Sequence, residues 1–285
     1  MSARAISWAV LAFGVALSLR ADDGLTVEEK ETIERAFPAA KSIDVDNFDG
    51  SITVTGTDAR EVRVEIQKTI RARSAEKIQE AKREVRLDIA QHDDALRLYV
   101  DGPFRCHCGD GSNNYHGSRF YGYEVTLDFT IRAPRDANVR LRGVNHGNIK
   151  VENTSGGFDV ENINGGVELV EVSGSGHAYA LNRPLKAVFS RNPAGASDFG
   201  SLNGDVEVGF RPGLSADLWL KTFNGNAYTD FDVAALPGRP PVREQRGGKF
   251  VYKSSQFYGV RAGQGGPELK FDAFNGDIRI RNREK

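Results

Sequence analysis

The sequence lacks an excess of charge of either sign. In 285 residues, 38 Lys and Arg side chains stand against 39 Asp and Glu side chains, for a formal net charge of −1. This balance gives no reason to expect nucleic acid or another polyanion as a partner. The sequence also lacks a phosphate-binding loop, a G-x-S-x-G elbow and an H-E-x-x-H helix, and its five histidines are dispersed. We therefore expect no catalytic residue and no cofactor.

Long apolar runs are also scarce, and the one that is present lies at the N-terminus. Met1–Ala21 combines Arg4 with an apolar stretch from Ala5 to Leu19 and a small residue, Ala21. This layout predicts a cleavable secretory signal over 1–21, followed by an N-terminal arm over 22–40. An uncleaved anchor is the alternative. No second run is long enough to cross a bilayer, so the mature chain is expected to be exported to the periplasm, the cell surface or the extracellular space, with no transmembrane span.

The chain has only two cysteines, and both lie in Cys106-His107-Cys108, within a loop expected over 101–122. Two cysteines in an exported chain favour a disulfide, although Cys-x-Cys closes a very small ring. The alternatives are free thiols and a metal site made by Cys106, Cys108 and either His107 or His116. Zinc normally takes four ligands, with cysteine pairs spaced by two to four residues. The spacing therefore favours a disulfide over a metal.

Glycine is plentiful, with 31 residues, and much of it lies in a repeated Asn/Asp-Gly turn. Apolar residues follow two and four places after the glycine, which is the alternation of a half-buried strand. Asn-Gly tolerates positive φ, so we expect that conformation at Gly165, Gly204, Gly225 and Gly276. The structural turn glycines are Gly50, Gly147, Gly165, Gly204, Gly225 and Gly276.

The turns recur about every 20 residues: Asn145 to Asn164 is 164 − 145 = 19, and Asn203 to Asn224 is 224 − 203 = 21. Such a step suits one coil of a parallel β-helix or β-solenoid, in which each coil pairs with the next. The alternative is an antiparallel β-sandwich, because Asn-Gly is also a hairpin signal. The expected fold class is all-β, with a repeat domain over 41–285.

Three further segments differ from this pattern. Residues 74–85 predict a short helix that Ser74 caps, with apolar residues on one face. Leu25–Ala36 is expected to form a short polar helix or an arm. Residues 231–267 break the repeat with prolines and a Gly-Gly pair, and predict an insertion.

The alternation also assigns side chains to the inside or the outside. Phe48, Phe223 and Phe274 each stand two places before a turn glycine, and we expect them to fill one corner of the core. Residues three places after a glycine are expected to point outward. That column mixes charges and therefore indicates a solvated face rather than an acid/base pair. Its members are Thr53, Lys150, Asp159, Glu168, Glu207, Tyr228 and Arg279.

Four segments together resemble the bacterial putative adhesin family, an exported β-strand-repeat domain of unknown function. They are Val45–Thr55, Ile131–Asn153, Ile163–Val172 and Phe271–Arg281. The resemblance extends over most of residues 41–281 and implies an adhesin-like, β-helical protein of the bacterial cell envelope. The family brings no catalytic residues.

Three functions stay open at this point. The first is an exported, non-enzymatic β-solenoid that presents a binding or structural surface to an envelope protein or a glycan. Residues that could form that surface are Trp219, Tyr228, Tyr115 and Tyr121. The second is a carbohydrate-active enzyme, a polysaccharide lyase or glycoside hydrolase, with Asp205, Glu207 and Asp277 as candidate acids. The third is an envelope assembly or stress factor that acts through a protein partner.

Overall fold

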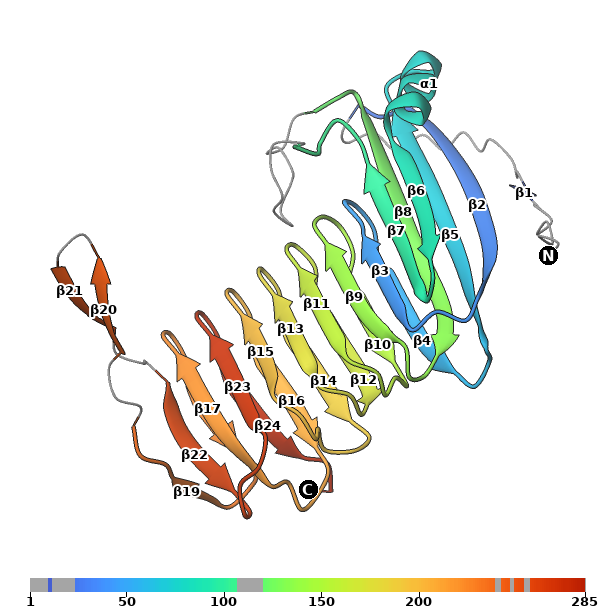
Figure 1. The fold of residues 1–285 in the computed structure, drawn as a ribbon. Helices are drawn as coiled ribbons and strands as arrows, with labels where there is room; N and C mark the ends of the chain where they lie inside the picture. The colour runs from blue at the N-terminus through green and yellow to red at the C-terminus, as the bar shows by residue number, and fades with distance from the viewer. Residues whose placement is uncertain are drawn as a thin grey trace. The chain divides into compact units, whose positions relative to one another are not determined.

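The structure, a computed structural model, describes residues 10–11, 24–106, 120–238, 242–246, 249–253 and 257–284. Over these residues the chain is all-β with a single helix, and its strands form two large mixed sheets and one separate hairpin (Figure 1). No helix in these ranges has the length and apolar character that crossing a membrane requires. Apart from Val10–Leu11, the expected secretory signal lies outside the described residues. The chain divides into two compact units, Met1–Ile149 and Lys150–Lys285.

The first unit has strands in both sheets. Its elements are β1 (Val10–Leu11), β2 (Val27–Pro38), β3 (Ser42–Asp46), β4 (Ile52–Thr57), β5 (Glu61–Ala72), α1 (Ala75–Glu84), β6 (Arg86–His92), β7 (Ala95–Asp101), β8 (Tyr123–Pro134) and β9 (Asn138–Gly143), and β10 (Ile149–Glu152) lies at its boundary. One sheet has the order β1-β2-β5-β8-β4 and the other the order β6-β7-β3-β9. β2, β5 and β8 pair antiparallel, whereas β3 pairs in parallel with both β7 and β9.

The segment Leu25–Ala36 has a local preference for helix, but the structure places it in a strand. The helix considered for Leu25–Ala36 is wrong, because β2 is an extended strand that pairs along its whole length with β5, from Val27↔Ala72 to Pro38↔Glu61. The long strand β5, with alternating apolar and polar residues, offers a full row of backbone partners, and this row outweighs the helix preference of a Glu-rich segment. The predicted helix is confirmed: α1 begins after Ser74, whose Oγ accepts a hydrogen bond from the Lys77 backbone N–H at 3.4 Å.

The second unit contains the repeats. Its elements are β11 (Phe158–Asn162), β12 (Val167–Val172), β13 (Gly176–Ala180), β14 (Leu185–Phe189), β15 (Ser197–Ser201), β16 (Val206–Phe210), β17 (Ala216–Thr222), β18 (Ala227–Thr229), β19 (Val233–Ala235), β20 (Val242–Arg246), β21 (Lys249–Lys253), β22 (Tyr258–Ala262), β23 (Glu268–Ala273) and β24 (Ile278–Asn282). From β11 to β18, successive strands alternate between the two sheets. We call each consecutive pair, such as β11/β12, a rung.

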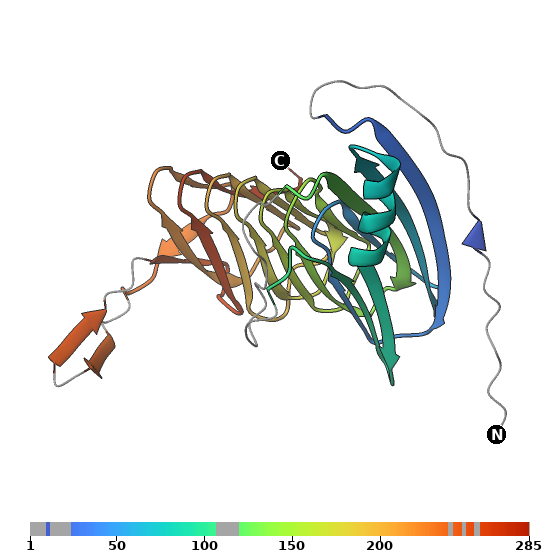
Figure 2. The ribbon, with the colours of Figure 1, turned by 90° about the horizontal axis from the view of Figure 1, so that it is seen from above.

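Neighbouring rungs pair in parallel in both sheets. In one sheet the order is β11-β13-β15-β23-β17, and in the other it is β12-β14-β16-β24-β18. The hairpin interpretation of Asn-Gly is therefore wrong for these strands. Figures 1 and 2 show the strands of this unit stacked rung upon rung, with the turns in register along one side.

The rungs do not stack in the order of the sequence. The rung β23/β24, which we call the closing rung, lies between β15/β16 and β17/β18, so that β23 is the red strand between two orange ones in Figure 1. The predicted insertion over 231–267 contains β19, β20, β21 and β22. Of these, β22 pairs antiparallel with both β17 and β19, while β20 and β21 pair with each other.

The core of the second unit lies between its two sheets. Alternate residues of the strands β11 to β17, β23 and β24 are buried. Five phenylalanine rings from both sheets pack against one another with centroids 5.2 to 6.5 Å apart. These rings belong to Phe158, Phe189, Phe199, Phe210 and Phe271. Full burial of such side chains stabilises the fold by about 1.5–3 kcal/mol each, so the rungs depend on one another for their stability.

Candidate functional site

The turns on one side of the second unit bring glycines into very close contact. A Cβ at Gly204 would lie 2.5 Å from the carbonyl carbon of Arg183, one at Gly276 would lie 2.2 Å from the Gly204 oxygen, and one at Gly225 would lie 2.1 Å from the Gly276 oxygen. Real Cβ atoms do not approach backbone so closely. Glycine is required here because successive turns touch.

The sequence predicts that backbone conformation selects glycine at the Asn-Gly turns, and the structure gives a different reason. Gly50, which follows Asp49 rather than an asparagine, has a φ of +110°. Gly147, Gly204, Gly225 and Gly276 have no positive φ, and a side chain at any of them would meet backbone atoms of a neighbouring turn. The expectation of positive φ is therefore wrong at all four Asn-Gly turns, because Gly165 has no positive φ either.

Beside the glycines, five asparagines form a ladder of side-chain hydrogen bonds. The Nδ2 of each asparagine donates to the Oδ1 of its neighbour over 2.8 to 2.9 Å, in the order Asn224, Asn275, Asn203, Asn182, Asn164. Each of the first four also donates its backbone N–H to the carbonyl of the residue that precedes the next asparagine. Stacked amides of this kind fix the register of adjacent strands. The ladder holds the turns as a rigid row.

The residue before each ladder asparagine is apolar and lies on the outside of the turn. We call this row the turn stripe; its members are Ile163, Leu181, Leu202, Phe274 and Phe223. The first three are half-buried, whereas Phe274 is 40% exposed and Phe223 is 70% exposed. The two phenylalanine rings stack on each other with centroids 4.9 Å apart and planes 5° apart. The stripe is thus an apolar surface that becomes more exposed toward β18.

This arrangement corrects the expected corner of the core. Phe223 and Phe274 do stack, but on the surface rather than inside. Phe48, in the first unit, is half-buried and stacks on Phe104 with centroids 3.9 Å apart. The three phenylalanines share a sequence position but not an environment.

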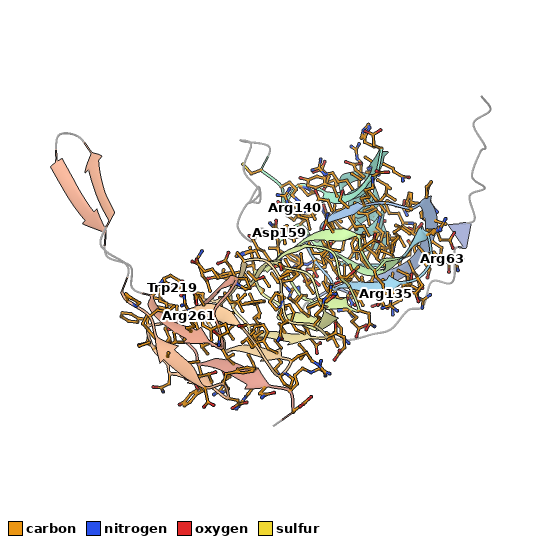
Figure 3. The ribbon with its side chains drawn as sticks, turned by 60° about the horizontal axis from the view of Figure 1, so that its bottom comes forward. Arg63, Arg135, Arg140, Asp159, Trp219 and Arg261 are labelled. Atoms are coloured by element: carbon orange, nitrogen blue, oxygen red, sulfur yellow. The ribbon has the colours of Figure 1, made fainter. Side chains whose placement is uncertain are left out.

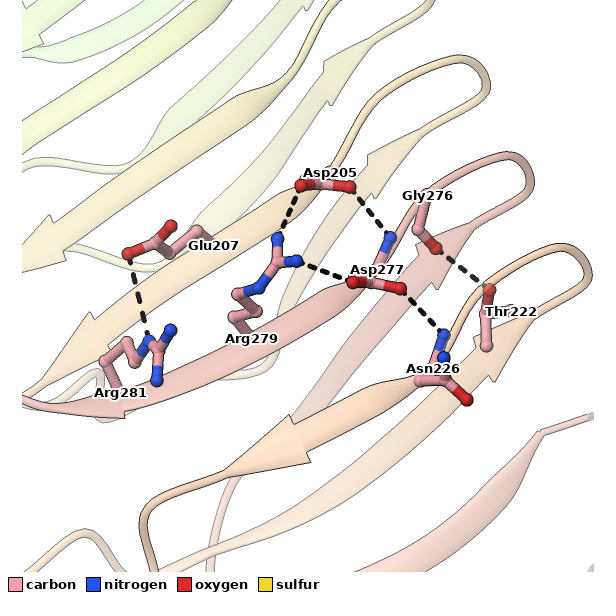
Figure 4. Close-up of polar contacts among 8 residues, drawn as sticks. All are labelled: Asp205, Glu207, Thr222, Asn226, Gly276, Asp277, Arg279 and Arg281. Carbon is pink, nitrogen blue, oxygen red and sulfur yellow. Dashed lines mark hydrogen bonds and ion pairs between the residues drawn. The ribbon is translucent and has the colours of Figure 1, made fainter.

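The candidate acids lie just past the turns and hold rungs together (Figure 4). Asp205 accepts a hydrogen bond from the Asp277 backbone N–H at 2.9 Å, and Asp277 in turn accepts one from the Asn226 backbone N–H at 2.9 Å. The Arg279 guanidinium donates to both carboxylates. The backbone N–H of Asp277 and then Arg279 hold the pKa of Asp205 below its ordinary value. A carboxyl group in this state is a poor general acid.

Glu207, the third candidate acid, points outward from β16 and lies 4.0 Å from Arg281. It belongs to a row that crosses one sheet in register, namely Glu168, Lys186, Glu207, Arg279 and Tyr228. This row mixes charges, as the sequence predicts. Asp159 lies on β11 in the other sheet, so its expected place in the same column is wrong.

The pH dependence of stability tests the role of Asp205. Because its pKa is lowered in the folded state, its contribution is present above the unfolded value of 3.8 and is lost as the pH falls through the lower folded value. We expect Asp205→Asn to be less stable than the wild type near neutral pH, and this difference to disappear in strong acid. Denaturant titrations from about pH 2 to about pH 7 measure it. Asp232→Asn, at an exposed position after β18, is the matched control. A difference that persists in strong acid would contradict this role.

Two of the aromatic residues expected at a binding surface belong to the second unit, Trp219 on β17 in one sheet and Tyr228 on β18 in the other. Trp219 is only 7% exposed, because its ring packs over Gly259 of β22, where a Cβ would lie 2.9 Å from the ring. Its expected exposure is therefore wrong. Figure 3 shows Trp219 close to Arg261, which forms an ion pair with Asp217 at 2.7 Å. Tyr228 is 50% exposed, as a surface role requires.

The other two candidate tyrosines belong to the first unit. Tyr121 is half-buried, and its hydroxyl donates to the Pro103 carbonyl at 3.0 Å. Tyr115 lies outside the described residues.

Only the first half of the Cys-His-Cys segment is described. Cys106 takes part in a disulfide, whereas His107, Cys108 and His116 lie outside the described residues, so its pairing with Cys108 stays a prediction. Arg105 is 4% exposed; it donates to the Val100 carbonyl at 3.0 Å and to Asp46 at 2.8 Å, and so fixes the base of this loop. Where the structure describes the chain, no three His, Cys, Asp or Glu side chains form a group that could hold a metal ion.

The sequence patterns missed two members of this site. Asn182 and Leu181 precede Arg183-Pro184 instead of glycine, so a search for Asn-Gly passes over them. The apolar-Asn dipeptide is the signal that could have found them, since it also occurs as Ile163-Asn164 and Leu202-Asn203. The exposure of the turn stripe had no comparable signal, because apolar residues at a turn are equally compatible with a core.

Comparisons with known proteins give weak likenesses. No protein-family model matches the chain, and no curated protein matches it. A solved putative cell adhesion protein from Clostridium sporogenes ATCC 15579 is 11% identical, over 89% of this chain and 100% of that chain, with a TM-score of 0.41. A putative adhesin from Bacteroides fragilis NCTC 9343 is 12% identical, over 88% and 97%, with a TM-score of 0.35. A putative lipid binding protein from Parabacteroides distasonis ATCC 8503 is 11% identical, over 88% and 96%, with a TM-score of 0.29. Scores this low carry no argument about this chain.

Proposed function

We propose that the chain is an exported, adhesin-like β-solenoid that binds a partner in the bacterial cell envelope through the turn stripe. The observation that carries this proposal is the exposed Phe223–Phe274 stack on the rigid asparagine ladder. Exposed apolar surface costs solubility, and a contiguous patch of it marks interaction sites. A surface fixed by hydrogen bonds loses little conformational entropy on binding.

The solenoid interpretation rests on the pairing of the second unit. Successive strands alternate between two sheets, and the corresponding strands of neighbouring rungs pair in parallel. A chain that winds around one core produces this pattern. The apolar N-terminal segment over 1–21 supports export.

Binding is preferred to catalysis because of the state of the candidate acids. Asp205 and Asp277 each accept backbone hydrogen bonds and share Arg279. A glycoside hydrolase needs one carboxyl group that keeps its proton near neutral pH, and the lowered pKa of Asp205 opposes that role. A protein partner fits the stripe better than a glycan, because the stripe consists of Ile, Leu and Phe flanked by amides that bond to one another.

A double variant tests the stripe. We expect Phe223→Ser with Phe274→Ser to weaken retention of the protein on the envelope fraction of the producing cells about tenfold or more, because aromatic side chains dominate binding energy. Phe223 is 70% exposed and Phe274 is 40% exposed, so the double variant should stay folded with only a modest fall in thermal stability. Sedimentation with isolated envelopes, with and without glycan-degrading enzymes, measures retention and separates protein from glycan partners.

Val233→Ser provides the matched control, because Val233 is 39% exposed and is opposite Ala262, which pairs with Ala216 at the end of β17 far from Phe223. This variant should bind like the wild type. Equal retention of the double variant and the control would contradict the proposed role of the stripe.

A further inference from the structure

The closing rung fills a slot between two rungs that precede it in the sequence. Lys270 of β23 is opposite Asp198 of β15 on one side and Trp219 of β17 on the other. In the second sheet, Arg279 of β24 is opposite Glu207 of β16 and Tyr228 of β18. Without residues 268–282, the facing edges of β15/β16 and β17/β18 lose their hydrogen-bonding partners.

The closing rung is held by every kind of contact that the unit uses. Its inward side chains are fully buried, namely Leu269, Phe271, Ala273, Ile278 and Ile280. Asn275 links Asn224 to Asn203 in the asparagine ladder, and Phe274 stacks in the turn stripe. Lys270 lies 3.5 Å from Asp198, and Lys221 lies 2.9 Å from Asp272. The slot therefore recognises this segment by shape, register and charge.

A short glycine-rich loop leads into the closing rung. Gly263, Gly265 and Gly266 have φ values of +58°, +78° and +153°, so the loop is folded into conformations that other residues rarely adopt. It passes beside the start of β17, where the Gln264 N–H donates to Ser215 Oγ at 2.9 Å and the Asp217 N–H donates to the Pro267 carbonyl at 3.1 Å. Extension of this loop would let the closing rung leave its own slot as a unit. The loop is the only segment that has to change its conformation.

We propose that the closing rung is exchanged between two copies of this chain. Residues 268–282 of the first copy fill the slot between β15/β16 and β17/β18 of the second copy. The same residues of the second copy fill the slot of the first. A second copy presents an identical slot, so every contact of the closing rung is remade and only the loop at 263–267 changes. Exchange of identical elements is a low-cost route to a two-fold dimer. Such a dimer carries two turn stripes, which strengthens binding to a surface that displays several partners.

Cross-linking between full-length copies tests the exchange. One copy carries Asp198→Cys and a second, isotope-labelled copy carries Lys270→Cys; both positions lie on the partly exposed face and are opposite each other across β15 and β23. The two copies are unfolded together, refolded and oxidised, and disulfides between labelled and unlabelled chains are identified by mass spectrometry. We expect this cross-link to form, and its share to rise with protein concentration because exchange is bimolecular.

A second pair of copies controls for chance contact. His177→Cys and Asp198→Cys are opposite each other across β13 and β15, which stay in the same copy when the closing rung is exchanged. This pair should give no cross-link between copies. A 198–270 cross-link that stays at the level of this control at every concentration overturns the proposal.

Variants of the loop give an independent readout. Gly263→Ala penalises the folded loop, because its φ of +58° is the left-handed region. The exchanged dimer relieves this penalty, so its ratio to monomer should rise about tenfold, as measured by size-exclusion chromatography with light scattering. Gly213→Ala, at a φ of +74° with open space around it, carries the same penalty in monomer and dimer and should leave the ratio unchanged. Equal ratios in both variants contradict the exchange.

Discussion

Gly204→Ala is expected to lower the free energy of unfolding by about 3–5 kcal/mol, which is among the largest effects of a single substitution. The added Cβ would lie 2.5 Å from the Arg183 carbonyl carbon and 2.6 Å from its oxygen, and backbone atoms cannot yield as a flexible side chain does. The neighbouring turns must separate, and the asparagine ladder between Asn182 and Asn203 must stretch with them. Denaturant unfolding followed by circular dichroism measures the loss.

Gly238→Ala is the matched control, because a Cβ at that position meets no atom within 4 Å. Its free energy of unfolding should stay within about 0.5 kcal/mol of the wild type. If Gly204→Ala cost no more than this control, glycine would not be required by contact between the turns.

Phe271→Ala is the second substitution with a large expected effect. Phe271 is fully buried, and its ring lies 5.4 Å from that of Phe199 and 6.4 Å from that of Phe210. Removal of a buried phenylalanine ring costs about 3–5 kcal/mol, from lost burial and from the cavity that remains. Because Phe271 belongs to the closing rung, the loss should appear in the unfolding of the whole second unit, as measured by thermal and denaturant titration.

Phe223→Ala is the matched control, because it removes a side chain of the same kind from the surface instead of the core. Phe223 is 70% exposed, so we expect its replacement to change the free energy of unfolding by less than about 1 kcal/mol. If the two variants lost similar amounts of unfolding free energy, Phe271 would not lie in the core and Phe223 would not lie on the surface.

The strands and their buried faces could be predicted from the sequence because the repeats obey a simple rule. Ile278 and Ile280 follow Gly276 by two and four places, and both are fully buried in β24. The order of the rungs could not be predicted. The same alternation occurs in every repeat, so nothing local indicates that Gly276 stacks on Gly204 rather than on Gly225 alone.

The reasons for individual residues were harder to predict than their positions. Positive φ and close approach both select glycine, and only the structure shows that Gly204 is required by the approach of Arg183. Trp219 lies between Leu218 and Leu220, whose alternation predicts that its side chain points outward, but β22 pairs with β17 and covers it. Long-range pairing of this kind decides exposure, and it leaves no local signal.

The stacking order of the second unit is the claim on which the account most depends, because the core, the turn stripe and the closing rung all follow from it. Nuclear Overhauser contacts between backbone protons of adjacent strands test it directly in the isotope-labelled protein. We predict contacts of Lys270 with both Asp198 and Trp219, and none between Asp198 and Trp219. Direct contacts between Asp198 and Trp219, or antiparallel contacts between β13 and β15, would contradict it.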